Sequence, residues 1–450
     1  MAAPHDTAPV HKQRLITFIV LAVAITIPGV ALSRAGHVDW PHPLQALIFG
    51  LAIVGAAFML SWAAEVAQLD ISAGLAIAVL AFIAVLPEYA VDLVFALDGG
   101  EAYKEFGAQC QAPELVGERE SPCALALANM TGANRLLIGL GWTMVVFIAW
   151  WQWRKRGQRM EGVALERSHS VELAFLSVAT VYSLAIPLRR SITLIDAAVL
   201  VTLFVLYMVR ISRAPAEEPH LVGPAVLVGS FPTPRRRAWV IGLFVFAAAV
   251  ILMCAEHFAE QLVESGESLG ISEFFLVQWL APLASEAPEL LVAGLYAWRL
   301  NTSAGLGTLV SSKVNQWTLL VGTLPIAFAI ASSSVDGLPI IARQREEILL
   351  TAAQSFFAVA VLLNLSMSVK EALVLFGLFW AQFLTGAFVP DEWHGEELVG
   401  FSIAYFAFGL YVLSRNRGVG RLLRDGFRTS YRELCADPPD PLPEGVSTPR

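Results

Sequence analysis

Five ionisable side chains lie in stretches of sequence that are otherwise almost wholly apolar. Two carboxylates occur in AVLPEYAVDLVFAL (84–97), two more in SEAPELLVAGLYAW (285–298), and one ammonium in a later apolar stretch. An ionised side chain at the centre of a membrane helix costs about 2.5–3.5 kcal/mol on insertion scales. We therefore expect bound cations, or pairing between the groups, to offset that cost. The five residues are Glu88, Asp92, Glu286, Glu289 and Lys313.

A Pro-Glu dipeptide marks both carboxylate stretches, at 87–88 and at 288–289. The carboxylates within a stretch are four and three residues apart, which puts each pair on one face of a helix. Because proline has no N–H, the carbonyl four residues earlier loses its helical donor. The carbonyls freed in this way belong to Ile83 and Ala284. Carbonyls beside a carboxylate are the oxygen ligands that Na⁺ or Ca²⁺ prefers, so the dipeptides predict cation ligands rather than simple kinks.

A second motif follows in the next apolar segment of each half, as LANMTGANRLLIGLG (127–141) and GTLVSSKVNQWTLLVG (307–322). Its small residues permit close helix packing, and its polar side chains supply further oxygens. A single asparagine could equally bond a neighbouring helix. The side chains that we expect to support the carboxylates are Asn129, Asn134, Ser285 and Ser312.

These motifs need helices that cross a membrane. A spanning helix takes about 20 mostly apolar residues, and about twelve such segments can be placed. They are far too long for β-barrel strands and do not alternate in polarity, so we predict an all-α polytopic membrane protein. The segments are 15–33, 44–67, 72–97, 124–150, 171–188, 192–211, 238–258, 272–299, 304–330, 347–365, 370–389 and 398–414.

The composition agrees with this prediction. Of 450 residues, 56% are hydrophobic and 15% are charged, with a mean hydropathy of +0.62, whereas soluble proteins carry about 25% charged residues. These values exclude a soluble enzyme, a disordered protein and a nucleic-acid binder, and leave the lipid bilayer as the main partner. The sequence holds no H-E-x-x-H or G-x-S-x-G motif, so an intramembrane enzyme is not expected. No required protein partner is evident.

The charges of the loops predict the orientation, because Lys and Arg accumulate on the cytoplasmic side. Twelve spans with both termini in the cytoplasm place all three basic segments inside and all three acidic ones outside. Only Arg189-Arg190 and Arg343/Arg345 fall on the acidic side. We expect a multi-pass protein of the cell (inner) membrane. The basic segments are 154–159, 210–237 and 415–432, and the acidic ones are 98–120, 256–273 and 391–397.

A linker rich in Pro and Arg divides the chain into halves of about five spans each, flanked by an added first helix and an added last helix. After the last span, residues 415–434 could lie on the membrane surface as a basic helix, and the Pro-rich residues 436–450 are expected to be disordered. The predicted parts are the cytoplasmic N-terminus with the added first helix (1–36), a first repeat (44–211), the cytoplasmic linker (212–237), a second repeat (238–390), the added last helix (391–414) and a cytoplasmic tail (415–450).

The four cysteines leave the redox state open. Cys110 and Cys123 share one outward loop, where a disulfide is permitted, but two unpaired thiols fit the sequence equally well. Cys254 lies in a predicted span and is expected to be a packing residue.

The two copies of each motif lie five predicted spans apart along the chain, so the copies cross the membrane in opposite directions. Inverted repeats of this kind occur in many secondary transporters, whose substrate sites lie at the midplane between repeats. Two inverted five-helix repeats, each with buried carboxylates, therefore predict a cation site exposed alternately to the two sides.

The motifs resemble the α-repeats of the sodium/calcium exchanger family, a branch of the Ca²⁺:cation antiporter superfamily. The family's first element is similar to G-T-S-x-P-E-L, matched by Leu86-Pro87-Glu88-Tyr89 and by Ala287-Pro288-Glu289-Leu290. Its second element is similar to G-N-x-x-G-S-N-x-x-N, matched by 128–134 and more weakly by 307–313. The resemblance covers roughly the whole region between the two added helices.

This resemblance implies a fold of ten helices in two inverted repeats and the exchange of one cation against another. It implies that Glu88 and Glu289 are the central Ca²⁺/Na⁺ ligands and that Asn134 is a side ligand. Lys313, in contrast, stands where the family has a second Asn or Asp ligand. A buried ammonium there would repel one cation and pair with Glu286 or Glu289, so the full Na⁺ complement of a sodium/calcium exchanger is not expected.

The leading hypothesis is a secondary antiporter that exchanges Ca²⁺ (or Na⁺) for Na⁺ or H⁺, with no permanently bound cofactor. Glu88 and Glu289 would be its ligands, supported by Asn134, Asp92 and Glu286. The alternative keeps the fold but makes the protein a proton-coupled Na⁺/H⁺ exchanger in which Lys313 replaces a bound cation. A channel or sensor that kept the repeats without turnover is the remaining hypothesis.

Overall fold

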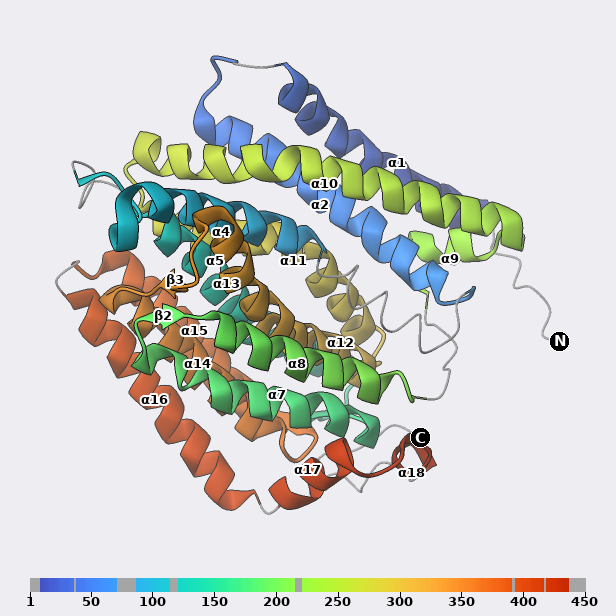
Figure 1. Cartoon of the computed structure of the whole chain (residues 1–450). Helices are drawn as coiled ribbons and strands as arrows, with labels where there is room; N and C mark the ends of the chain where they lie inside the picture. The colour runs from blue at the N-terminus through green and yellow to red at the C-terminus, as the bar shows by residue number, and fades with distance from the viewer. Residues whose placement is uncertain are drawn as a thin grey trace. The chain divides into compact units, whose positions relative to one another are not determined.

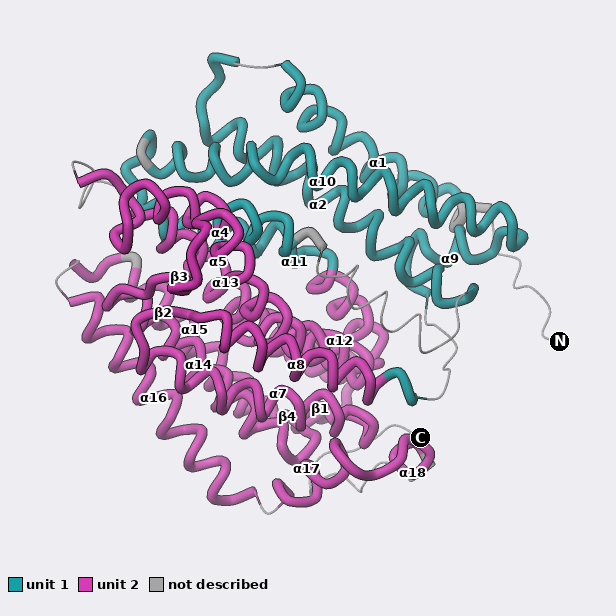
Figure 2. Tube along the Cα trace, in the orientation of Figure 1, with its two compact units in different colours: residues 1–95, 212–288 teal, residues 96–211, 289–450 magenta. Residues whose placement is uncertain are grey.

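The structure, a computed structural model, describes residues 9–35, 38–70, 86–113, 120–214, 221–390, 393–416 and 418–436. The chain divides into two compact units, shown in Figure 2: unit 1 holds residues 1–95 and 212–288, and unit 2 holds residues 96–211 and 289–450. The division falls inside two helices, α4 (Leu86–Phe106) and α11 (Glu273–Trp298). Some predicted features lie outside the described residues: the first part of the span 72–97 with Ile83 and Ala84-Val85, the linker residues 215–220, and the tail from 437 onward.

The described residues are predominantly helical, which confirms the predicted all-α class. Among them, nine helical segments are long and apolar enough to cross a membrane. Three other long helices, α4, α11 and α14 (Ala342–Leu362), coincide with predicted spans and hold buried carboxylates. The nine segments are Gln13–Arg34, His42–Ala67, Pro122–Lys155, Arg167–Leu188, Leu194–Ile211, Thr233–Gly266, Thr302–Ser332, Val369–Gly386 and His394–Arg415.

Unit 1 is built around one unusually long helix. Among its described residues, the helices that lie wholly within it are α1 (Pro9–Arg34), α2 (His42–Ala67), α9 (Pro224–Gly229) and α10 (Thr233–Leu269). The long helix, α10, packs along α2, and α1 packs on both of them (Figure 1). It has 37 residues, about 55 Å at 1.5 Å per residue. This length exceeds the hydrocarbon thickness of about 30 Å, so α10 must tilt or extend beyond the bilayer.

The predicted linker 212–237 is partly helical in unit 1. It contains α9, and α10 already begins at Thr233, so Arg235-Arg236-Arg237 belong to a helix rather than to a loop. Arg236 donates to both carboxylate oxygens of Asp70, at 2.7 and 2.8 Å. This bidentate pair fixes the start of α10 against the residues that follow α2.

Unit 2 contains two series of elements in the same order. Apart from short 3₁₀ turns, each series has a helix, a π-helical segment, a continuing helix, a strand, a helix, a second strand and a last helix. The first series is α5 (Pro122–Leu136), η3 (Leu137–Trp142), α6 (Thr143–Lys155), β1 (Gly162–Ala164), α7 (Ser170–Ser183), β2 (Ser191–Ile192) and α8 (Leu194–Ile211). The second is α12 (Thr302–Asn315), η6 (Gln316–Leu320), α13 (Val321–Ser332), β3 (Leu338–Pro339), α14, β4 (Ser366–Ser368) and α15 (Val369–Phe388).

Elements of the first series contact elements of the second series in reciprocal pairs. Helix α5 packs on α14 while α12 packs on α7, and α6 packs on α15 while α13 packs on α8. The strands follow the same rule, because β1 pairs antiparallel with β4 and β2 pairs antiparallel with β3. Reciprocal contacts of this kind indicate a twofold relation. An element of the first series contacts a non-equivalent element of the second, and their two counterparts contact each other in the same way. The opposite membrane orientation of the two series stays a prediction.

Three helices follow the second series: α16 (His394–Arg415), α17 (Val419–Phe427) and α18 (Tyr431–Ala436). Helix α16 is the predicted added last helix, and it packs on α14 and α15. Helix α17 packs on α7, and α18 packs on the 3₁₀ turn Arg167–His169 that precedes α7. The segment predicted to lie on the membrane surface therefore also has a protein-facing side.

Two arginines that the orientation rule leaves on the acidic side are paired with carboxylates. Arg189 Nη2 donates to Asp196 Oδ1 at 2.5 Å, and Arg343 Nη1 donates to Glu120 Oε1 at 3.1 Å. Each pair places a neutralising carboxylate beside the misplaced positive charge.

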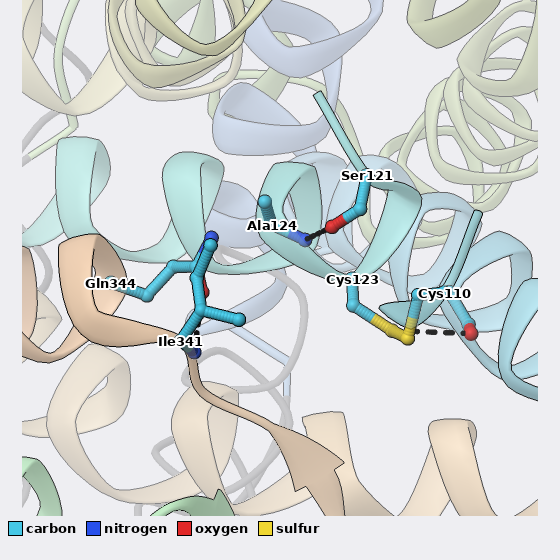
Figure 3. The surroundings of a disulfide bond; sticks show 7 residues. Cys110, Ser121, Cys123, Ala124, Ile341 and Gln344 are labelled. Carbon is cyan, nitrogen blue, oxygen red and sulfur yellow. Dashed lines mark hydrogen bonds between the residues drawn. A yellow bond between two sulfur atoms is a disulfide. The ribbon is translucent and has the colours of Figure 1, made fainter. Parts of the chain in front are cut away.

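A disulfide joins Cys110 to Cys123 (Figure 3), which settles the pairing that the sequence leaves open. It links the chain after α4 to the first turn of α5. At the same end of α5, Ser121 Oγ accepts a hydrogen bond from the Ala124 N–H at 3.3 Å. Of the other two cysteines, Cys254 is buried and Cys435 is exposed.

We expect only Cys254 and Cys435 to react with a maleimide when the protein is denatured without reductant, and all four cysteines to react after reduction. Intact-mass measurement gives both counts. Because the bridged cysteines are 13 residues apart, Cys110→Ser should lower the free energy of unfolding by about 3 kcal/mol. The control, Cys435→Ser, should change it little. Four reactive thiols without reductant would contradict the pairing.

Candidate cation-binding site

The first Pro-Glu motif places two carboxylates one helical turn apart on α4 in unit 1. Glu88 is 4% exposed and Asp92 is 2% exposed. The predicted shared face is therefore a buried one. Two carboxylates this close to one another in an apolar environment favour a bound cation or proton, because both cannot remain ionised without compensation.

The second Pro-Glu motif lies within α11, with Pro288 inside the helix. The Ser285 and Glu286 side chains are buried in unit 1, 3% exposed each. The Ser285 hydroxyl is 3.2 Å from the carbonyl oxygens of Ala281 and Pro282. Donation to either carbonyl leaves the lone pairs of Ser285 Oγ available to a cation.

Two buried side-chain oxygens on α11 and α12 in unit 2 accept no hydrogen bond from the part of the chain that the structure describes. They are Glu289 Oε2, directly after Pro288, and Asn315 Oδ1 on α12. A buried oxygen without a donor costs about 1–3 kcal/mol, and more when it is charged. A cation or a proton would satisfy such groups, so these two oxygens are candidate ligands.

In the second motif on α5, Asn129, Thr131 and Asn134 are all fully buried. The Thr131 hydroxyl lies 2.9 Å from the Leu127 carbonyl oxygen, to which it can donate. The Asn134 Nδ2 donates to the Met130 carbonyl at 2.9 Å. This bond orients the amide so that its Oδ1 points away from its own helix turn.

Lys313 on α12 is fully buried and bonds to the second motif of the other series. Its Nζ donates to Asn134 Oδ1 at 2.7 Å and to the Asn134 backbone carbonyl at 2.5 Å. It also lies 5.3 Å from the centre of the Trp317 ring. The ammonium thus holds the amide oxygen that the resemblance assigns to a cation. Ser312, beside it, is only half-buried.

A second buried charge, which the sequence analysis did not consider, lies directly after Asn134. Arg135 is 1% exposed, and its Nη1 donates to Glu347 Oε2 on α14 at 2.7 Å. Its Nη2 donates to Gln382 Oε1 on α15, and Gln382 Nε2 donates to Glu397 Oε1 on α16 at 3.2 Å. An arginine inside a predicted span was the available signal, since such a residue needs a buried partner.

Within the described residues, no group of three or more His, Cys, Asp or Glu side chains is close enough together to hold a metal ion. Glu88, Asp92 and Glu286 belong to unit 1 and Glu289 belongs to unit 2. The carboxylates are thus paired along helices rather than clustered within one unit. Each unit contains buried acidic oxygens, and unit 2 also contains the buried amine of Lys313.

The family model for the sodium/calcium exchanger protein matches residues 41–212 and 239–387. The chain belongs to the sodium/calcium exchanger family. Members of this family are membrane transporters of cations rather than catalytic enzymes, and the chain is a multi-pass membrane protein and a Ca²⁺/cation antiporter of that kind.

The chain is also similar to solved structures of other proteins. One, an H⁺/Ca²⁺ exchanger named CAX, is 40% identical with a TM-score of 0.81, covering 95% of this chain and 100% of its own. Another, native YfkE, is 13% identical with a TM-score of 0.53, and the match covers 87% of this chain and 99% of its own. At this identity the similarity shows only that the two folds are alike. A comparison with curated protein sequences gives no match.

We expect Glu347→Gln to lower the free energy of unfolding by about 3–5 kcal/mol, because it leaves the buried Arg135 charge without its carboxylate. The neighbouring Glu346 is only half-buried, so Glu346→Gln should change it by no more than about 0.5 kcal/mol. Denaturant unfolding of both variants in the same detergent checks this. Equal effects would show that the Arg135 pair is not what holds α5 to α14.

Proposed function

We propose that this protein exchanges Ca²⁺ for H⁺. The observation that carries this choice is the bonding of Lys313 Nζ to Asn134 Oδ1 at 2.7 Å. Support also comes from the H⁺/Ca²⁺ exchanger CAX, which is similar to this chain over almost its full length. An oxygen held by an ammonium is not free for Na⁺, whereas H⁺ needs only a carboxylate to bind to.

The proposed ligands are Glu88 and Glu289, one from each Pro-Glu motif. Asp92, Glu286, Asn129, Ser285 and Ser312 support them, and so does the Ala284 carbonyl, whose helical donor Pro288 removes. Oxygen ligands of these types suit Ca²⁺. Glu289 Oε2 has no hydrogen-bond donor among the described residues, which supports its place as a ligand.

Exchange then follows from electrostatics. Buried carboxylates cannot stay ionised in an apolar site without a positive charge nearby. Two of them are neutralised either by one Ca²⁺ or by two H⁺, so the two substrates compete for the same oxygens and are not bound together. Alternating access of the loaded site couples their movements in opposite directions.

In this proposal Lys313 is the substitute for a bound Na⁺. Its ammonium is covalently attached, so it stays in the protein throughout the cycle and is never exchanged. A Na⁺ entering the same position would have to displace Nζ from two hydrogen bonds and would meet a like charge. The site therefore selects against Na⁺ at Asn134.

We further propose that the protein lies in the cell (inner) membrane with both termini in the cytoplasm. The loop charges support this orientation, since the three basic segments then lie inside. The disulfide between Cys110 and Cys123 supports an extracytoplasmic position for that loop, because disulfides persist in oxidising compartments.

Purified protein in liposomes with an acidic interior should take up radioactive Ca²⁺ as H⁺ leaves. Glu88→Gln and Glu289→Gln should each abolish uptake, because either change removes one of the two central carboxylates proposed to neutralise Ca²⁺. The exposed Glu260 on α10 provides the control, and Glu260→Gln should transport normally. Uptake driven by a Na⁺ gradient but not by a pH gradient would overturn the proposal, and so would H⁺-driven Na⁺ movement without Ca²⁺ flux.

The role of Lys313 can be tested separately. Lys313→Asn should release the Asn134 oxygen and allow Na⁺ to compete with Ca²⁺, so that external Na⁺ inhibits H⁺-driven Ca²⁺ uptake at least tenfold more strongly than in the wild type. The exposed Lys155 supplies the control variant, Lys155→Asn. Unchanged Na⁺ sensitivity with unchanged flux in Lys313→Asn would show that the ammonium does not exclude Na⁺.

A further inference from the structure

The C-terminal helices α17 and α18 lie outside the residues that the family model matches. One side of α17 is buried, with Leu422, Asp425 and Gly426 as its buried residues. A Cβ at Gly426 would overlap Ala174 Cβ and come within 2.5 Å of the Ser170 carbonyl oxygen. The absence of a side chain at Gly426 therefore lets α17 approach the α7 backbone closely.

Polar bonds fix this buried side to the 3₁₀ turn before α7 and to α8. Arg167 Nε donates to Asp425 Oδ2 at 2.9 Å, and Arg210 Nε on α8 donates to the Gly426 carbonyl at 3.0 Å. Burial raises the pKa of the Asp425 carboxyl, but hydrogen bonds from Arg167 and Thr429 outweigh that effect and hold the pKa below its usual range. Asp425 is therefore ionised at neutral pH.

The opposite side of the segment is basic. Its arginines all have exposed side chains, and those on α17 recur at helical spacing, which puts them along one face. Beside them, Phe427 is 41% exposed. Asp425 Oδ2 accepts a hydrogen bond from Arg167, and Asp425 Oδ1 lies 3.8 Å from Nε of Arg424. The exposed arginines are Arg415, Arg421, Arg424, Arg428 and Arg432.

This basic face lies close to a membrane surface. Helix α16 is long and apolar enough to cross a membrane and ends at Arg415. Only residues 416–418 separate it from α17, so the first residue of α17 is at most about 15 Å from the end of the span. Arg415 Nη1 donates to Tyr411 OH at 2.7 Å, a pairing of residue types that favour the membrane interface.

We propose that the arginine face of residues 415–432 binds the headgroups of anionic phospholipids in the leaflet where α16 ends. A short tether to a membrane span keeps this face at a high effective concentration of headgroups, which favours lipid over a soluble polyanion. An exposed Phe next to the arginines can enter the headgroup region. Each arginine contributes about a fivefold preference for an anionic surface.

The full-length protein offers one exposed thiol for a test, since Cys254 is buried and the other two cysteines form the disulfide. The protein carries a fluorescent donor on Cys435 and is placed in nanodiscs of phosphatidylcholine. A trace of headgroup-labelled lipid, either phosphatidylglycerol or phosphatidylcholine, serves as the acceptor for energy transfer. Transfer to phosphatidylglycerol should be the stronger, and the excess should fall with added salt. The triple variant Arg421→Gln/Arg428→Gln/Arg432→Gln should reduce the preference about 100-fold.

The matched control removes three exposed arginines outside this segment, as Arg156→Gln/Arg159→Gln/Arg213→Gln, and should keep the preference. A second pair of variants separates charge from docking. Gly426→Ala should expose the α17 amides to deuterium exchange, whereas Gly420→Ala, with nothing within 4 Å of its Cβ, should not. Both glycine variants keep every arginine and should still prefer phosphatidylglycerol.

Three results would overturn the proposal. Equal transfer to the two lipids in the wild type would show that there is no headgroup preference. Equal losses in the two triple variants would assign the preference to net charge rather than to this face. A loss in Gly426→Ala as large as in the Arg421 triple variant would assign it to the docked shape of the segment.

Discussion

A buried ammonium held by one asparagine is the interaction on which the polar interior of unit 2 depends. Lys313 contacts both the amide and the backbone oxygen of Asn134, and an ammonium left without such partners in an apolar interior would be very costly. The next residue, Arg135, is tied in the same way to Glu347. Two consecutive residues of α5 therefore each bind a charged side chain of the second series, and together they fix how the two series meet.

The bond between Lys313 and Asn134 changes which oxygens of the second motif are available to a cation. In a pattern made only of asparagines and small residues, every amide oxygen is a potential ligand for a mobile cation. Here one of those positions is a lysine whose Nζ bonds to Asn134, so in the function that we propose Asn134 does not bind a transported cation. In the same proposal, the buried carboxylates are the groups whose charge changes during transport.

Much of the fold could be predicted from the sequence, because length and hydropathy determine spans almost alone. The Pro-Glu motifs were also visible, since a carboxylate in an apolar stretch is conspicuous, and the structure places Glu88, Asp92 and Glu286 among the buried residues. The Arg135 network and the strand pairs were not predicted. The residues that these contacts join are about 150 to 250 positions apart in sequence, such as Arg135 with Glu347 and Ser191 with Pro339. A local sequence pattern cannot predict a contact between residues so far apart. The tail shows the same limit, because its basic face is a local pattern whereas its docking through Gly426 depends on a close approach to Ala174.

The exchange of partners between the two series has a consequence for biosynthesis. Strand β1 pairs with β4, with Ala164 opposite Ser366, so the first strand must wait for about 200 more residues before its partner exists. At elongation rates of about 5–20 residues per second, this wait lasts about 10–40 s. During that time the first series is already in the membrane with Arg135 still unpaired by Glu347. A factor that binds exposed polar groups inside the bilayer would therefore stabilise the nascent first half until the second half is inserted.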